Sequence, residues 1–170
     1  MHAFGSDREG GIVSTARALG SIPNVRQDIA HTTARSRNFE RAYAIFRMSL
    51  GFDIFMHGFA RILTGVAPFV AVTEKPFVKT IIPMPVVHYF LTILPYLEFA
   101  VGALLIVGLF TMQACIAGAL IMIVLIFGMG ARQEWGSVGN EMIYAAWYFL
   151  LIAFNENNWF CLDNLRKKSS

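Results

Sequence analysis

Three titratable side chains, Asp53, His57 and Arg61, recur at intervals of four residues inside one long apolar stretch, residues 43–66. Residues four apart on a helix lie on the same face, so these three form a ladder along one side. An unpaired ionised group in hydrocarbon is costly, so the ladder needs partners, water or a ligand. A histidine beside a carboxylate exchanges protons near neutral pH, which the reduction of a quinone requires. The spacing therefore predicts a proton-accepting or quinone-contacting site.

A fourth ionisable residue, Glu98, lies in the middle of the next apolar stretch. If the two stretches are antiparallel helices, Glu98 is level with Asp53 and His57. Pro95, three residues earlier, removes a backbone donor and favours a kink that could admit water or a ligand. Glycines beside the ladder and beyond Glu98 allow close approach of a neighbouring helix or a ligand. We expect catalytic residues His57, Glu98 and Asp53, and ligand-contacting residues Arg61, Gly58, Gly102 and His88.

The elements that must position these residues are membrane-spanning helices. The chain has 170 residues, of which 56% are hydrophobic and only 15% charged, whereas about a quarter of the residues of soluble domains are charged. The apolar stretches are continuous, which favours helices over the alternating strands of a membrane barrel. The sequence predicts an all-α integral membrane protein, an antiparallel four-helix bundle with spans at about 43–66, 86–110, 112–131 and 138–154.

The distribution of Lys and Arg predicts the orientation of these spans. Basic residues concentrate in residues 26–42 and in the tail, and are fewer in the two loops on the opposite side. By the positive-inside rule, both termini are then expected on the cytoplasmic side of the membrane. We expect this membrane to be a bacterial-type inner membrane. Residues 1–40 are predicted to be a polar extension in which glycines and Pro23 interrupt any long helix, followed by a membrane domain at 41–166 and a basic tail at 167–170. Because the basic residues flank spans, they do not indicate nucleic-acid binding.

Several other chemistries lack their residues in this sequence. There is no CxxC pair, and Cys115 and Cys161 are expected to be free thiols. Histidine and cysteine are not arranged at metal-ligand spacing, so no metal site is expected. Flavin, haem and iron–sulfur motifs are also missing. Arg47 is expected to extend to the inner lipid phosphates, and Glu141 to be solvated at the outer boundary.

The two helix patterns together resemble the DoxX family of small four-helix membrane proteins. The first is R-x3-G-x5-HG, at Arg47, Gly51, His57 and Gly58; the second is LPYLEFAVGALLIVGLFT, which begins at Leu94 and contains Pro95, Glu98 and Gly102. The closing NNWFCLDNLRKK is similar to the Leu-Asp segment with which these proteins often end. The resemblance covers residues 41–166. It implies a subunit that supports quinone-linked redox chemistry, as in thiosulfate:quinone oxidoreductase, with quinone as the cofactor and a protein partner in a membrane complex.

Two other functions remain open from the sequence. In the first, the charged residues form an ion-paired core that only fixes helix packing, and the chain is a non-catalytic accessory or assembly subunit or a homo-oligomer. In the second, the midplane carboxylates serve a proton-coupled carrier, although four helices offer little room for alternating access. Whether the chain itself is catalytic is also open. A ring-sized cavity between His57 and Glu98 would favour the quinone hypothesis, and a dry, fully paired core would favour packing.

Overall fold

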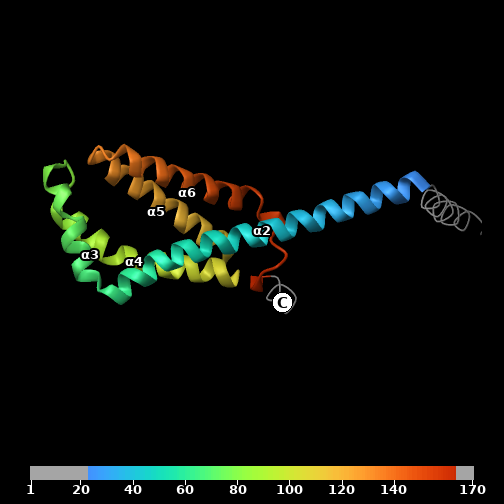
Figure 1. Ribbon diagram of the computed structural model, residues 1–170, viewed down its shortest axis with the longest axis horizontal. Helices are drawn as coiled ribbons and strands as arrows, with labels where there is room; N and C mark the ends of the chain where they lie inside the picture. Colours follow the sequence, from blue (N-terminus) through green and yellow to red (C-terminus); the bar gives the residue numbers. More distant parts are fainter. Residues whose placement is uncertain (1–22, 164–170) are drawn as a thin grey trace, which may run out of the picture. The chain divides into compact units, whose positions relative to one another are not determined.

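The computed structural model describes residues 23–163, except for the side chains of residues 23–26, 28 and 29 (Figure 1). Within that range every regular element is helical. The α-helices are α2 (Pro23–Thr64), α3 (Val66–Thr73), α4 (Met84–Val107), α5 (Thr111–Ala131) and α6 (Trp135–Ala153), and the 3-10 helices are η1 (Lys75–Lys79) and η2 (Asn155–Asn157). The chain divides into two compact units, Met1–Phe39 and Glu40–Ser170. The second unit contains all the predicted site residues.

Helix α2 is longer than the first predicted span, because it begins at Pro23 and not near residue 43. The expectation that the predicted extension contains no long helix was therefore wrong for residues 23–40. Proline is well tolerated at the first position of a helix, where its missing N–H would be unpaired in any case. The part of the predicted extension before Pro23 lies outside the described residues.

Gly65 ends α2 and turns the chain. Its φ of 98° lies in the region that favours glycine. The helix axis bends by 103° between Ala30–Thr64 and Val66–Lys79, so the first predicted span, residues 43–66, lies in α2 up to Thr64 and ends at the bend. The bend brings α3 back to pack on α4.

The second and third predicted spans are confirmed as apolar helices. In the part of the chain that the structure describes, α4 and α5 are long and apolar enough to cross a membrane, and the bent α2–α3 pair would raise the number from two to three. Helix α6 forms within three residues of the predicted bounds but is not among these candidates, since its first turns carry Asn140 and Glu141. Four spans, their antiparallel order and their orientation therefore stay predictions.

A tight turn joins α4 to α5. Gly108 has a φ of 71°, and both Gly108 and Leu109 donate their N–H groups to the carbonyl of Leu104, at 2.8 Å and 3.1 Å. This is the glycine-ended closure that satisfies the last carbonyls of a helix.

Glycines set how closely α2 approaches α4. A Cβ added at Gly51 would lie 3.0 Å from the backbone nitrogen of Ile106, and one at Gly102 would lie 2.6 Å from the Cα of Phe55. At Gly58 an added Cβ would overlap the backbone of Pro95 and Phe99. Gly51, Gly58 and Gly102 therefore lie on the surface along which these two helices touch.

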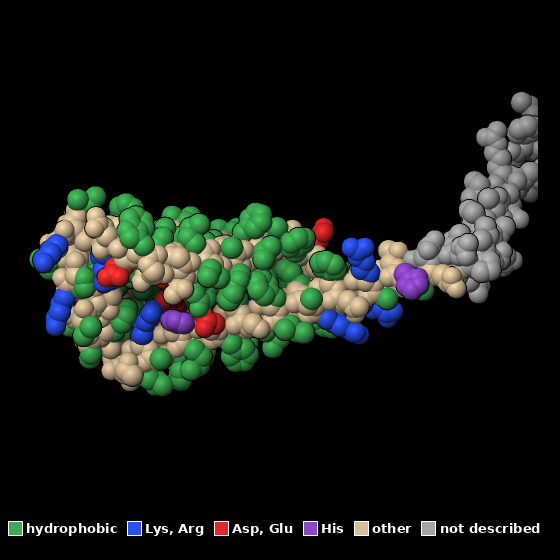
Figure 2. All heavy atoms as spheres, turned by 45° about the horizontal axis from the view of Figure 1, so that its top comes forward, with side chains coloured by type: hydrophobic (Ala, Val, Ile, Leu, Met, Phe, Trp, Pro, Cys, Tyr) green, Lys and Arg blue, Asp and Glu red, His purple; other side chains and the backbone are tan. Residues whose placement is uncertain are grey.

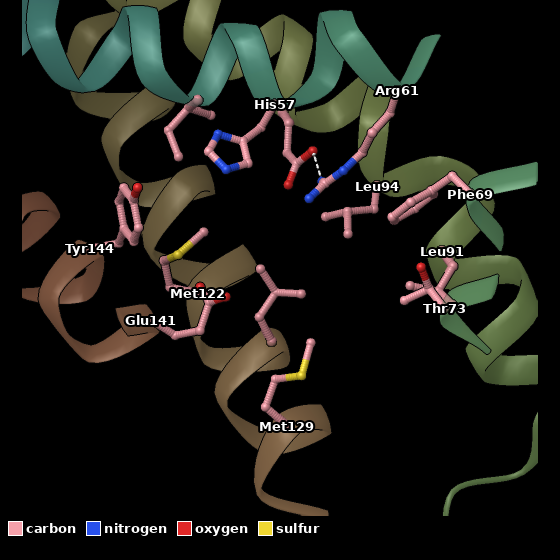
Figure 3. Close-up of a pocket in the computed structure, with 13 residues that line it drawn as sticks. His57, Arg61, Phe69, Thr73, Leu91, Leu94, Met122, Met129, Glu141 and Tyr144 are labelled. Carbon is pink, nitrogen blue, oxygen red and sulfur yellow. Dashed lines mark hydrogen bonds and ion pairs between the residues drawn. The ribbon is translucent and has the colours of Figure 1, made fainter. Parts of the chain in front are cut away.

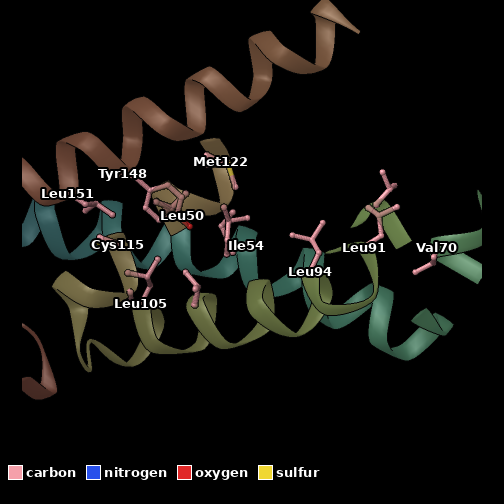
Figure 4. Packing of buried hydrophobic residues seen from close by; sticks show 14 of the residues in the cluster. Leu50, Ile54, Val70, Leu91, Leu94, Leu105, Cys115, Met122, Tyr148 and Leu151 are labelled. Carbon is pink, nitrogen blue, oxygen red and sulfur yellow. The ribbon is translucent and has the colours of Figure 1, made fainter. Parts of the chain in front are cut away.

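The core of the second unit contains side chains from α2 to α6 (Figure 4). Tyr148, Leu105 and Leu151 are fully buried, and Leu50 and Cys115 are nearly so. Figure 2 shows apolar side chains over much of the visible face, one group of basic, acidic and histidine side chains toward the left, and further charged side chains elsewhere. Many exposed side chains on α4 and α5 are large and apolar, as expected of a surface that faces lipid.

Candidate functional site

The centre of the site is an ion pair between α2 and α4. The Nη1 of Arg61 donates a hydrogen bond to Oε2 of Glu98. Glu98 is only 4% exposed, and the guanidinium of Arg61 also lies over the ring of Phe69 on α3, with Cζ 4.7 Å from the ring centre. Cation–π contact of this kind adds to the ion pair. Arg61 therefore links three helices at the point where the chain bends.

His57 lies one turn before Arg61 and is held by its own helix. Its Nδ1 is 2.9 Å from the carbonyl oxygen of Asp53 and 3.8 Å from the Asp53 carboxylate. A carbonyl only accepts hydrogen bonds, so this contact favours the tautomer with the proton on Nδ1. Nε2 is then the basic nitrogen of the ring. Tyr144 of α6 also lies beside Asp53.

A pocket of about 140 Å³ opens next to the ion pair (Figure 3). It is lined from five helices, and its polar groups come from α2, α3, α4 and α6. The lining residues are Ile54, His57, Arg61, Phe69, Thr73, Leu91, Leu94, Glu98, Met122, Leu125, Met129, Glu141 and Tyr144. Thus the charged groups face a cavity and are not enclosed in a solid core.

The predicted site residues fall into two groups. His57, Arg61 and Glu98 line the pocket, and Asp53 contacts His57 from one turn away without lining it. The other three predicted residues are also absent from the lining. Gly58 and Gly102 lie in the contact between α2 and α4.

His88 belongs to a separate pair nearer the start of α4. Its Nδ1 is 2.8 Å from Oε2 of Glu74, and its side chain is largely exposed. His88 is therefore on the same helix as Glu98 but does not line the pocket.

Glu141 corrects a sequence-based expectation. It was predicted to be solvated at the membrane boundary, but it is partly buried and lines the pocket within electrostatic range of Glu98, His57 and Arg61. Tyr144, one turn later on α6, lines the same wall. Their three-residue spacing is the signal that could have placed both on one helix face. Thr73 and Phe69 had no such signal, because only the bend at Gly65 brings α3 to the pocket.

Arg47 also differs from expectation, since it is 2% exposed and does not reach toward lipid phosphates. Its Nη1 donates to Oδ1 of Asn158 at 2.6 Å, and its Nη2 donates to the carbonyl of Phe160 at 2.9 Å. A buried guanidinium is retained where hydrogen bonds of this kind compensate its desolvation. Arg47 therefore holds the C-terminal segment against the bundle.

Asp163 completes that end of the molecule. Its carboxylate accepts hydrogen bonds from the backbone N–H groups of Phe110 and Thr111, at 2.7 Å and 2.9 Å, where α5 begins. A carboxylate at a helix N-terminus satisfies unpaired donors and interacts favourably with the helix dipole. The Leu-Asp segment singled out in the sequence is thus a cap on α5.

Metal chemistry finds no support in residues 23–163, where no group of three or more His, Cys, Asp or Glu side chains could hold an ion. Cys115 and Cys161 are free thiols, the first buried and the second partly buried. The polar groups of the pocket are instead hydrogen-bonding and proton-exchanging groups.

The chain matches no family model, no curated protein and no solved structure. The resemblance stated above therefore depends on the motifs in residues 41–166 alone.

Proposed function

We propose that this chain is a DoxX-type membrane subunit that binds the ring of a quinone in the pocket beside Arg61 and Glu98 and supports quinone-linked redox chemistry. The observation that carries the proposal is that the buried ion pair opens on one side into a cavity. An ion pair that served only helix packing would be expected to have apolar side chains filling this space.

The volume of the pocket supports a single ring. An engineered cavity of about 150 Å³ in another protein binds benzene, and the pocket here is about 140 Å³. A quinone head group has a six-membered ring with two carbonyl oxygens. Arg61 can donate a hydrogen bond to one of these oxygens, since its guanidinium carries five N–H groups and one contact to Glu98 uses only part of them.

The side chains around the pocket provide a route for protons. Reduction of a quinone to a quinol adds two electrons and two protons, and each carbonyl oxygen becomes a hydroxyl. His57, with Nε2 as its basic nitrogen, and Glu141 can exchange protons with the ligand. The electrons must come from a partner electron-transfer protein, because the sequence has no flavin, haem or iron–sulfur motif. We assign to this chain the binding of the ring and the delivery of protons.

The proposed setting is an inner membrane in which α2, α4, α5 and α6 cross as an antiparallel bundle with both termini in the cytoplasm. Short turns between α4, α5 and α6 support alternating directions, and the basic residues before the first apolar stretch support the orientation. Glu141, which lowers the apolar character of α6, faces the pocket and so need not be exposed to lipid.

Binding of a quinone to the purified protein tests the proposal. A tail-less or short-tailed quinone should bind saturably to the wild type, and His57→Ala and Glu98→Gln should weaken binding by roughly tenfold each, the effect of about 1.4 kcal/mol. His88→Ala is the matched control, because His88 is on α4 but outside the pocket. Equal affinity in all four proteins would remove the proposed site.

The second candidate is a non-catalytic accessory or assembly subunit. The satisfied hydrogen bonds favour it: Glu98 is paired with Arg61, and Nδ1 of His57 with a backbone carbonyl. Under this hypothesis the same substitutions would lower the stability of the bundle or its co-purification with a partner, and no quinone would bind. Thermal unfolding with and without quinone separates the two, since only a ligand of the folded state raises the midpoint.

A further inference from the structure

A second hollow, of about 150 Å³, lies beside the polar pocket, between α4, α5 and η1. Its walls are almost entirely apolar. The residues that line it are Phe77, Ile82, Val86, Val87, Phe90, Leu91, Val124, Leu125, Phe127, Gly128 and Met129. We call this hollow the apolar groove.

The apolar groove and the polar pocket share a wall. Leu91, Leu125 and Met129 line both. All three side chains are flexible hydrocarbons or thioethers, and methionine in particular adapts to an occupant. The two hollows therefore adjoin but differ in character, because six residues with ionisable groups or hydroxyls line the first and almost only apolar side chains line the second.

The mouth of the apolar groove opens on the outer surface of the helices. Val86 is 57% exposed and Phe127 is 61% exposed, whereas Val87 and Phe77 are buried behind them. Gly128 lines the groove, and a Cβ added there would be in ordinary van der Waals contact with the ring of Phe77, at 3.6 Å. A larger side chain at Gly128 would therefore occupy the groove.

We propose that the ligand is an amphiphile whose polar ring lies in the pocket and whose hydrocarbon tail passes the shared wall into the apolar groove. This inference rests on the proposed function, since it takes the ring to be that of a quinone, and it adds that the physiological quinone is a tailed one. The shared wall of Leu91, Leu125 and Met129 is the reason for choosing the ligand's own tail over an unrelated lipid chain, because it places the two hollows next to each other. The exposed mouth lets the tail extend into the bilayer.

Photo-crosslinking tests where the tail lies. The probe is a quinone with a diazirine on its tail, added to the full-length protein in detergent and in phospholipid vesicles, and the labelled residues are identified by mass spectrometry. We expect labels in 82–90 and 124–128. An excess of tail-less quinone, at about 100 times its Kd, should lower this labelling by roughly a hundredfold, because ring and tail belong to one ligand.

Two variants separate the groove from the pocket. Gly128→Leu should abolish labelling in the groove while the tail-less quinone still binds, and Gly130→Leu, two residues later with no atom near its added Cβ, should leave labelling unchanged. Val86→Trp, at the exposed mouth, provides a second block that does not alter buried packing.

Three other results would overturn the proposed tail site, and each has a different pattern of labelling and binding. Labels in the groove that the tail-less quinone does not displace would mean that the groove takes a hydrocarbon chain independently of the ring. Labels elsewhere, with the ring still bound and sensitive to His57→Ala, would overturn the tail site and leave the proposed function in place. If the tail-less quinone does not bind at all, the proposed function itself fails.

Discussion

Arg61→Met is expected to destabilise the protein more than Glu98→Gln, although both substitutions remove the same ion pair. The two partners differ in what remains around them. Glu98 is 4% exposed, so Arg61→Met leaves a buried carboxylate without its hydrogen-bonded cation. Removing one partner of a buried pair typically costs about 3–5 kcal/mol.

In Glu98→Gln the group left without its charged partner is Arg61, which is less buried than Glu98. The Arg61 side chain is 27% exposed, and the ring of Phe69 still lies 4.7 Å from Cζ. The neutral amide at position 98 can still accept a hydrogen bond. The expected loss of stability is therefore smaller, about 1–2 kcal/mol.

The double variant gives the sharper comparison. With both charges gone, neither partner is left uncompensated, so Arg61→Met with Glu98→Gln should cost less than the sum of the single changes, by about 2 kcal/mol. Denaturant unfolding in detergent micelles, followed by tryptophan fluorescence, measures all four proteins. Equal losses for the two single variants, or a double variant equal to their sum, would refute the reasoning that the pair is buried and coupled.

Three further predictions concern packing and capping. Gly118→Ala should destabilise the bundle by about 1–3 kcal/mol, because an added Cβ overlaps the ring of Tyr148. Gly130→Ala on the same helix should be neutral or slightly stabilising, because no atom lies near its added Cβ. Thermal unfolding of the two variants compares their stabilities. Asp163→Ala should cost about 1 kcal/mol and speed hydrogen exchange at the start of α5, and unchanged exchange would show that the cap does not protect those amides. Arg47→Met should release the C-terminal segment to limited proteolysis while α5 and α6 stay packed, and an unchanged digestion pattern would contradict its role there.

The sequence was sufficient for α4 and α5, where long and mostly apolar stretches predicted the helices to within three residues of their bounds. It also predicted that the charged side chains of the first apolar stretch need partners, water or a ligand, because an unpaired charge in hydrocarbon is costly. In the structure Arg61 is hydrogen-bonded to Glu98 on the neighbouring helix.

The remaining site residues depend on contacts between distant parts of the chain. Glu141 could not be placed in the pocket without knowing which face of α6 turns inward, and Thr73 reaches it only through the 103° bend after Gly65. Arg47 was misassigned because its partners, Asn158 and Phe160, are more than 100 residues away and belong to a segment with no regular pattern.

A crystal structure of the protein with a short-tailed quinone would test the central claim most directly. The account predicts the ring in the pocket, with a carbonyl oxygen within hydrogen-bond distance of Arg61 or His57 and the start of the tail directed toward Leu91 and Met129. A quinone bound elsewhere on the protein, with the pocket beside Glu98 unoccupied, would contradict it.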